Sequence, residues 1–186
     1  MDIYKEGSGN VGTTNTLRVM GPKAGIITFL GDLFKTIVAV VIVYLIFRGS
    51  YPQIIRLLML YAGFGAIIGH NYPFYLHFRG GKGIACTAGV IASVVPMTIP
   101  GCLLTFIIMV AITRYVSVGS IAVVTVLLIQ NIIFGQLGWL GLDGAARIEF
   151  YIVSALLAAM AIWRHRENIK RLANGTENKF SMGRHD

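Results

Sequence analysis

Long apolar stretches separated by short polar loops dominate the chain. Residues 24–47 form the first stretch long enough to span a bilayer, because about 20 helical residues cross the hydrocarbon core. Further apolar stretches cover residues 54–68, 117–134 and 148–163. This pattern predicts an all-α polytopic membrane protein, and we expect residues 1–186 to form a single integral membrane domain.

The central segment, residues 83–113, contains no Asp, Glu, Lys or Arg, so it forms either one kinked crossing helix or a hairpin of two. Pro96 and Pro100 lie near its middle, where proline breaks a helix or begins a turn. A hairpin returns Arg114 to the side of Lys82, which the positive-inside rule favours. We therefore expect two short helices here, and about six membrane-spanning helices in all, within residues 24–163.

Three details concern the predicted spans. Asp32 and Lys35 lie in the first apolar stretch at i, i+3 spacing, so we expect them to form a charge-neutralising pair on one face. Gly65 and Gly69, at i, i+4 spacing, predict close helix packing. Ser117 is placed to cap the helix that begins near it.

The placement of charge gives the protein an orientation. The chain is 55% hydrophobic and only 13% charged, which lies outside the range of soluble domains. Its formal net charge of +8 is carried by short loops between apolar stretches, which is typical of inward-facing membrane loops and not of nucleic-acid binding. Three polar segments, residues 1–23, 69–83 and 164–186, fall on this cation-rich side, which we take to be cytosolic.

The middle polar segment contains a glycine-dense turn. Gly80, Gly81 and Gly83 surround Lys82, so backbone N–H groups are uncovered beside a positive charge, and this combination suits a phosphate. An ATP-type phosphate loop is excluded, because Leu76 stands where its first glycine belongs and Gly83 where its Ser or Thr belongs. A plain tight turn with anchoring charges is the alternative.

The first polar segment, residues 1–23, is rich in Gly, Thr and Asn. We expect a loop that turns helical towards Arg18. Its hydroxyl and amide groups, together with Arg18 and Lys23, suit hydrogen bonding to a polyol or a phosphate, and a disordered tail is the alternative.

The third polar segment, residues 164–186, begins with a run of cations. If the last helix continues past Arg164, then His165, Asn168 and Leu172 lie on one face. The alternative interpretation is a stop-transfer anchor that contacts lipid headgroups.

Together the three polar segments closely resemble the bacterial acyl-phosphate:glycerol-3-phosphate acyltransferases, the PlsY family. The matching blocks are Gly7-Ser8-Gly9-Asn10-Val11-Gly12-Thr13-Thr14-Asn15 with Arg18, then Gly69-His70-x-Tyr72-Pro73 leading to Phe78-Arg79-Gly80-Gly81-Lys82-Gly83-Ile84-Ala85, and His165-Arg166-x-Asn168-Ile169-x-Arg171-Leu172 with Gly175-x-Glu177. Family members carry one further membrane helix before the first block, so we expect six spanning helices where the family has seven.

The resemblance implies a bacterial inner-membrane enzyme with its active-site loops in the cytosol. It would transfer an acyl group from a fatty acyl phosphate to the 1-hydroxyl of glycerol 3-phosphate, giving lysophosphatidic acid and phosphate, the first step of phospholipid synthesis. Its partners would be these two substrates and membrane lipids, with no cofactor, no metal and no nucleic acid. A small transporter or a lipid-binding scaffold with basic loops is the alternative function.

The resemblance also implies roles for particular residues. The candidate catalytic residues are Ser8, Lys82 and His165, and the candidate substrate-binding residues are Asn10, Asn15, Arg18, His70, Gly80, Gly81, Gly83 and Asn168. In this hypothesis Arg18, Lys82, His165 and Asn168 grip the acceptor phosphate, the backbone of residues 80–83 holds the acyl phosphate and the developing oxyanion, and Ser8 and Asn10 orient the glycerol hydroxyls. Either His165 or the phosphate of the donor accepts the hydroxyl proton.

Overall fold

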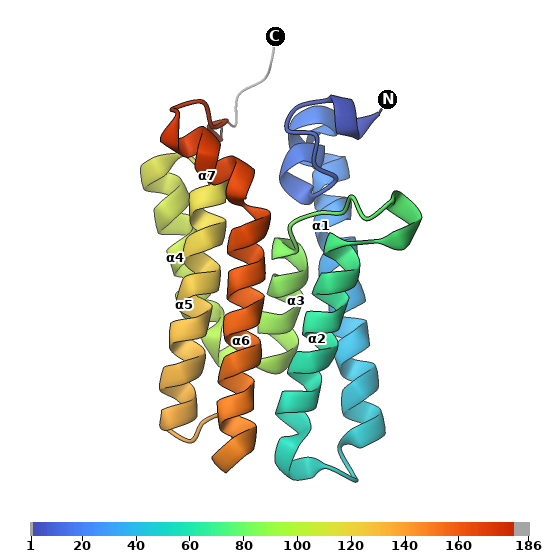
Figure 1. Cartoon of the computed structure of the whole chain (residues 1–186), viewed down its shortest axis with the longest axis vertical. Helices are drawn as coiled ribbons and strands as arrows, with labels where there is room; N and C mark the ends of the chain where they lie inside the picture. The colour runs from blue at the N-terminus through green and yellow to red at the C-terminus, as the bar shows by residue number, and fades with distance from the viewer. Residues whose placement is uncertain (1, 181–186) are drawn as a thin grey trace.

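The computed structural model describes residues 2–180, and over that range all its regular structure is helical. Its helices are α1 (Thr13–Phe47), α2 (Ile55–Asn71), α3 (Ile84–Val94), α4 (Ile99–Thr113), α5 (Val116–Gln136), α6 (Gly144–Arg164) and α7 (Arg166–Ala173), with short 3₁₀ turns η1 (Ile3–Lys5), η2 (Pro52–Ile54), η3 (Phe74–Leu76) and η4 (Pro96–Thr98). The long helices run side by side in one bundle (Figure 1). The end of the third polar segment, residues 181–186, lies outside the described residues.

Most of the helices are suited to a membrane. The segments around α1, α2, α4, α5 and α6 are long and apolar enough to cross one, and α3 is a shorter apolar helix. Large apolar side chains face outward, for example Ile27 at 71%, Leu45 at 57% and Ile112 at 75% exposed. Such a surface is stable against lipid and not against water. The prediction of an all-α polytopic membrane protein is therefore confirmed.

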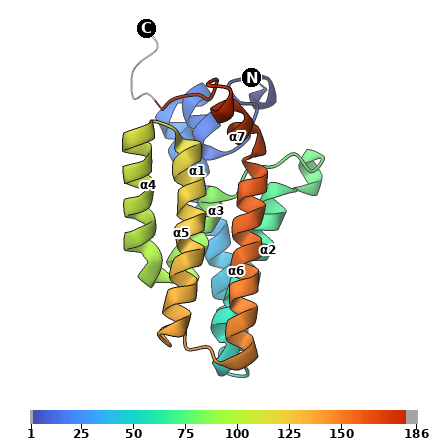
Figure 2. The same ribbon diagram turned by 60° about the vertical axis from the view of Figure 1, so that its left-hand side comes forward.

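The central uncharged segment forms the predicted hairpin. Helix α3 ends at Val94, η4 contains Pro96, and α4 starts at Ile99 with Pro100 in its first turn, where the missing N–H costs no helical bond. The two helices run in opposite directions (Figures 1 and 2). At about 1.5 Å per residue, α3 is only about 16 Å long, so it cannot cross the hydrocarbon core. Its N-terminus begins below the upper ends of α5 and α6 (Figure 1).

The first polar segment is more helical than predicted. Its last part is helical from Thr13, and a break at Gly21, whose φ is 85°, separates it from the long spanning part of α1. The helix starts early because Asn10 Oδ1 accepts a hydrogen bond from the N–H of Gly12, and Thr16 Oγ1 donates to the carbonyl of Gly12. These side chains supply the turn that a plain loop would lack.

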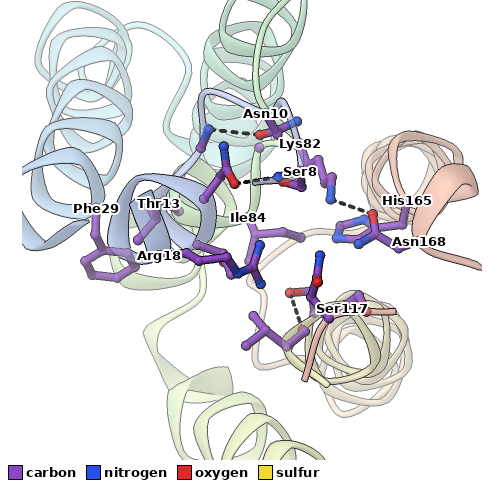
Figure 3. Close-up of a pocket in the computed structure, with 18 of the residues that line it drawn as sticks. Ser8, Asn10, Thr13, Arg18, Phe29, Lys82, Ile84, Ser117, His165 and Asn168 are labelled. Carbon is purple, nitrogen blue, oxygen red and sulfur yellow. Dashed lines mark hydrogen bonds between the residues drawn. The ribbon is translucent and has the colours of Figure 1, made fainter. Parts of the chain in front are cut away.

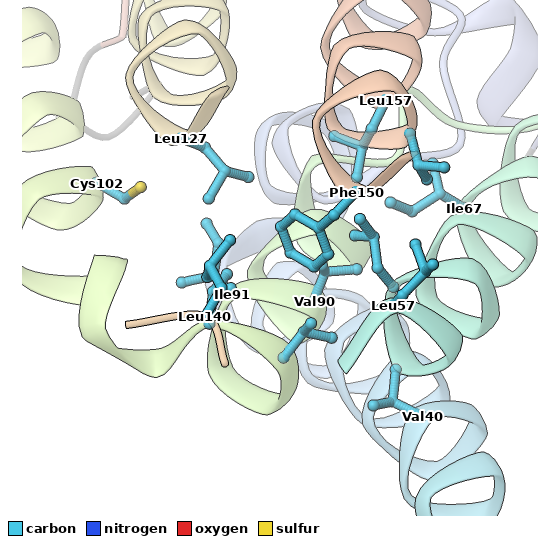
Figure 4. Close-up of a cluster of buried hydrophobic side chains, with 14 of the residues drawn as sticks. Val40, Leu57, Ile67, Val90, Ile91, Cys102, Leu127, Leu140, Phe150 and Leu157 are labelled. Carbon is cyan, nitrogen blue, oxygen red and sulfur yellow. The ribbon is translucent and has the colours of Figure 1, made fainter. Parts of the chain in front are cut away.

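Packing inside the bundle is dense on one side of each helix. Phe150, Leu157 and Val90 are among the most buried side chains, and they lie together with Leu57 between α2, α3 and α6 (Figure 4). Gly63 allows the close approach of α2 to α3, since a Cβ there would lie 2.6 Å from Val90 Cγ2.

Two predictions about single positions in the bundle were wrong. A Cβ at Gly65 or Gly69 would meet nothing within 4 Å, so this pair does not mediate close helix packing. Ser117 is not a cap either, because α5 begins after Tyr115 without a side-chain cap bond. Instead, Ser117 Oγ donates a hydrogen bond of 2.9 Å to Glu177 Oε1. A partner distant in sequence therefore takes the hydroxyl that local rules assign to the helix.

Candidate active site

A cavity of about 170 Å³ opens where the three polar segments meet at one end of the bundle (Figure 3). Nine of the predicted site residues line it, namely Ser8, Asn10, Asn15, Arg18, His70, Lys82, Gly83, His165 and Asn168. Gly80 and Gly81 do not line it. In Figure 3 the side chains of Arg18 and Lys82 reach towards the cavity from different segments, and His165 and Asn168 lie beside Lys82. Residues up to 160 positions apart in sequence thus surround one space.

The N-terminal wall of the cavity is shaped by Asn15. Its Oδ1 accepts a hydrogen bond of 2.8 Å from the N–H of Ser8, and its Nδ2 donates one of 3.1 Å to the carbonyl of Glu6. Gly7, with a φ of 59°, packs against the same amide, since a Cβ there would lie 2.3 Å from Asn15 Oδ1. Asn15 is itself buried, and both polar ends of its side chain bond to the turn that presents Ser8 to the cavity.

Lys82 is held by a chain of polar side chains from the C-terminal segment. Its Nζ donates to Asn168 Oδ1, and Asn168 Nδ2 donates to Glu177 Oε1 at 2.6 Å. The other carboxylate oxygen, Glu177 Oε2, lies 2.7 Å from Arg171 Nε. Glu177 therefore fixes which way the Asn168 amide points, so that the amide oxygen faces the ammonium.

Burial lowers the pKa of Lys82. Desolvation of the ammonium inside the protein is the main reason that this pKa falls from 10.5 to about 8. Glu177 opposes this shift, and the positive charges of Arg171, Arg164 and Arg18 add to it. Lys82 is thus a cation near neutral pH, poorly solvated and surrounded mostly by like charge. A site of this kind favours an anionic ligand.

His165 lies at the junction of α6 and α7 and is 3% exposed. Burial lowers its pKa from 6.5 to about 4, so the imidazole is neutral at physiological pH. Its Nδ1 is 2.7 Å from the carbonyl of Ala161, which can only accept, so Nδ1 carries the proton. The other nitrogen, Nε2, is consequently a hydrogen-bond acceptor.

The backbone of Gly80 and Gly81 is engaged on both sides. Their N–H groups donate to the carbonyls of Asn71 and His70, both at 3.2 Å. Their carbonyls accept from the guanidinium of Arg164, at 2.8 Å for Gly80, and at 2.8 and 3.1 Å for Gly81. Any side chain is excluded, because a Cβ would lie 2.0 Å from the carbonyl oxygen of His70 at Gly80 and 2.1 Å from His70 Nε2 at Gly81.

A partly buried charge cluster adjoins the cavity. The predicted pair of Asp32 and Lys35 is confirmed at 2.6 Å, and His70 joins it, with Nδ1 3.2 Å from Asp32 Oδ1 and 2.8 Å from Lys35 Nζ. The donor atoms of Asp32, His70 and Cys86 lie within 4.8 Å of one another, a spacing that a metal ion could use. The Lys35 ammonium already lies between the carboxylate and the imidazole, so the protein itself supplies the cation there.

An apolar wall completes the cavity. Phe29 from α1, Ile84 from α3, Phe106 from α4 and Val116 from α5 line it beside the polar groups. The N-terminus of α3 also borders the cavity through Gly83 and the following residues, so helical N–H groups and the positive end of a helix dipole are available to an anion. The arrangement therefore accommodates a phosphate next to a hydrocarbon chain.

Fold and site together define a polytopic membrane protein with an anion-binding pocket at one end of its helices. The chain belongs to the glycerol-3-phosphate acyltransferase family, whose model, described as Glycerol-3-phosphate acyltransferase, matches residues 1–175. The family predicted from the sequence motifs is thereby confirmed.

Curated relatives support this membership over nearly the full chain. A glycerol-3-phosphate acyltransferase of Clostridioides difficile is 42% identical, with 98% of this chain and 83% of the relative covered. One from Halalkalibacterium halodurans is 40% identical, with 97% and 82% covered.

Solved structures share the fold. The crystal structure of PlsY (YgiH), described as an integral membrane glycerol 3-phosphate acyltransferase in its glycerol 3-phosphate form, has a TM-score of 0.81 at 31% identity and covers 97% of this chain and 83% of that one. Its lysophosphatidic acid form has a TM-score of 0.74 at 32% identity, with 94% and 81% covered.

The sequence did not single out Arg164, Arg171 and Glu177 as site residues. Arg171 and Glu177 line the cavity, and Arg164 holds the glycine turn beside it. Each belongs to the cationic third segment, where an anchoring role in the lipid headgroups explains the same composition. The available signal was that Arg171 and Glu177 both fall in the third block that matches the family.

Proposed function

We propose that the protein transfers a fatty acyl group from an acyl phosphate to the 1-hydroxyl of glycerol 3-phosphate, releasing lysophosphatidic acid and inorganic phosphate. The observation that carries this proposal is the meeting of Arg18 and Lys82, from two different polar segments, at one cavity that also has an apolar wall. The relatives' names and the two ligand forms of the PlsY structure support glycerol 3-phosphate as the acceptor.

The acceptor phosphate would bind between Arg18 and Lys82. A guanidinium offers paired donors to phosphate oxygens, and the desolvated ammonium of Lys82 supplies a strong point charge. Ser8 and Asn10, on the N-terminal wall, would then orient the glycerol hydroxyls. The acceptor is thus held at its phosphate end while its 1-hydroxyl remains free to react.

The donor would place its phosphate at the N-terminus of α3 and its chain against the apolar wall. The N–H groups of Gly80 and Gly81 already form hydrogen bonds within the protein. We therefore assign the anion contacts to Gly83, to the first turn of α3 and to Lys82. Gly80 and Gly81 instead give the turn its shape. Holding both substrates in one pocket can contribute about 7–11 kcal/mol to the acceleration.

The reaction needs no external base, because the released phosphate can take up the hydroxyl proton. The 1-hydroxyl oxygen attacks the acyl carbon, the bond from that carbon to the phosphate oxygen breaks, and the hydroxyl proton ends on the released phosphate. His165 can accept this proton first at Nε2 or simply orient the hydroxyl, because its fixed tautomer presents an acceptor. A neutral imidazole is better suited to this role than to gripping the phosphate.

The placement of charge supports a bacterial inner-membrane location with the cavity open to the cytosol. The cations of α7 and of the glycine turn lie at the cavity end of the bundle, as cytosolic loops do. Membrane lipids then surround the helix bundle, and the lysophosphatidic acid product enters the same bilayer. The whole chain would act as one membrane domain.

The test is a direct assay of purified protein with radiolabelled glycerol 3-phosphate. Acyl phosphate should give labelled lysophosphatidic acid, whereas acyl-CoA or acyl carrier protein should not. Lys82→Ala should abolish transfer, and Lys170→Ala is the matched control, because Lys170 is an exposed lysine on α7 that pairs with Glu167. Near-normal turnover of Lys82→Ala, or transfer from acyl-CoA alone, rejects the proposal.

A further inference from the structure

Arg164 is a cation that the proposed reaction does not use. It is the last residue of α6, and its guanidinium faces the glycine turn instead of the cavity. Nη2 donates to the carbonyls of Gly80 and Gly81 at 2.8 Å each, and Nε donates to Gly81 at 3.1 Å. A planar fork with donors on two nitrogens matches two adjacent carbonyl oxygens, and a lysine ammonium has no counterpart of the Nε donor.

The same guanidinium also contacts the other end of this loop. Its Cζ lies 5.0 Å from the ring centroid of Tyr72, the residue that ends α2. Arg164 therefore joins the end of α6 to the point where the loop leaves α2 and to the point where it returns towards α3. The loop extends sideways from the bundle between these points (Figures 1 and 2).

Little freedom remains for the two residues before Lys82. Arg164 donates hydrogen bonds to the carbonyls of both glycines. The N–H groups of the same glycines donate to the carbonyls of Asn71 and His70. A backbone fixed on both sides determines the direction in which the next side chain leaves the chain. Here that side chain is Lys82, which points to Asn168.

We propose that Arg164 is a positioning residue that clamps the Gly80–Gly81 carbonyls and thereby aims Lys82 into the cavity. This role rests on the proposed function, in which Lys82 contacts the reacting phosphates. Arg164 itself touches neither substrate.

The positive charge of Arg164 has a second, separable effect. The charged groups that act on Lys82 are Glu177, Arg171, Arg164 and Arg18, besides its burial. Removing the Arg164 charge takes away one repulsion, so the pKa of Lys82 should rise. A lysine at position 164 keeps the charge, but its side chain is one bond shorter than that of arginine and has no counterpart of the Nε donor, whereas a glutamine removes the charge.

The experiment compares Arg164→Lys, Arg164→Gln and the parent in the acyl phosphate assay. Both variants should lose kcat by about tenfold or more with a smaller change in KM, since the lost contacts are charge-assisted hydrogen bonds that act on the transition state through Lys82. The alkaline limb of the kcat/KM profile should stay in place for Arg164→Lys and move to higher pH for Arg164→Gln.

A second measurement follows the loop without the reaction. Trypsin should cut at the exposed Arg79 faster in both variants than in the parent, because the turn beside it is no longer clamped. Arg48→Gln is the control: Arg48 also ends a helix and stacks on a tyrosine, Tyr44 at 5.5 Å, but at the opposite end of the bundle. It should change neither readout.

The outcomes separate the two proposals. Wild-type kcat in Arg164→Lys or unchanged trypsin cleavage overturns the positioning role, and an unmoved alkaline limb in Arg164→Gln overturns only the charge effect on Lys82. An inactive parent protein overturns the proposed function instead, and the cleavage rates then still decide whether Arg164 holds the loop. If Arg164→Gln fails to fold, Arg164→Lys carries the test of the clamp.

Discussion

The charge state of Lys82 should limit activity at alkaline pH. Burial keeps its pKa at about 8, so the ammonium that the phosphates need is lost as pH rises through that value. We expect kcat/KM, which reports the free enzyme, to fall above about pH 8. In an active Lys82→Arg variant this limb should disappear, since a guanidinium stays protonated. An identical alkaline limb in both proteins would assign the titration to another group.

His165 should make the fold sensitive to acid. Its folded pKa of about 4 lies below the ordinary 6.5, so between these values the unfolded chain binds more protons than the folded one. Stability is therefore fully present above pH 6.5 and is lost as pH falls towards 4. Melting temperatures in detergent should fall over this range, and less steeply in His165→Gln. Parallel curves for the two proteins would show that His165 does not titrate in this way.

Sequence motifs identified the residues at the cavity better than the bonds between them. Ser8, Arg18, Lys82 and His165 were predicted and do line it. The partner of Ser117 was missed, because short-range rules assign a serine at a helix start to capping, while its actual acceptor, Glu177, is 60 residues away. Polar side chains in a largely apolar protein take the partner that the fold brings near, which one segment alone does not reveal.

At the scale of elements, the glycine turn should tolerate no side chain. Gly80→Ala places a Cβ against the backbone of His70, which cannot move away, so we expect loss of activity and a lower melting temperature. Gly81→Ala meets the His70 ring and should also impair activity. Gly65→Ala, with open space around it, is the matched control and should behave like the parent. Normal activity of Gly80→Ala would contradict this view of the turn.

The boundaries between helices could be predicted where proline marks them, and not where hydrogen bonds of polar side chains do. Pro96 and Pro100 lie in a segment without charges, so the hairpin followed from length and the positive-inside rule. A turn to helix was predicted only towards Arg18, and the earlier start of α1 at Thr13 was missed because the Gly- and Asn-rich segment before it has a loop-like composition. Asn10 and Thr16 stabilise that first turn by bonds to Gly12. Composition cannot distinguish such local bonds from disorder.

At the scale of the whole molecule, the short α3 explains why three distant segments can meet. It begins below the upper ends of α5 and α6, so the cavity that Lys82 and Gly83 line at its N-terminus lies beneath α7 and the N-terminal segment (Figure 1). Lys82 and Asn168, 86 residues apart, become hydrogen-bond partners as a result. The sequence predicted that the segments share one side of the membrane, but not their contacts, because contacts depend on helix order around the bundle.

The sideways loop between α2 and α3 should lie in the headgroup region of the cytosolic leaflet. It exposes three aromatic side chains, Phe74 at 79%, Tyr75 at 70% and Phe78 at 63%, at the cavity end of the bundle (Figure 2). Aromatic residues at this level are favoured at the membrane interface, where one side is apolar and the other wet. Because the loop leads directly into the glycine turn, an anchored loop also limits the motion of Lys82.

This placement can be measured with a single tryptophan in vesicles. Phe78→Trp is made in a protein whose own Trp139 and Trp163 are replaced by Phe, and brominated lipids then report its depth. Bromine near the headgroups should quench its fluorescence more strongly than bromine near the chain ends. A variant retaining only Trp163 serves as the reference, since that side chain is exposed near the end of α6. Emission as in water, without quenching by either lipid, would mean that the loop stands clear of the bilayer and is held by contacts within the protein, such as those of Arg164 and Tyr4.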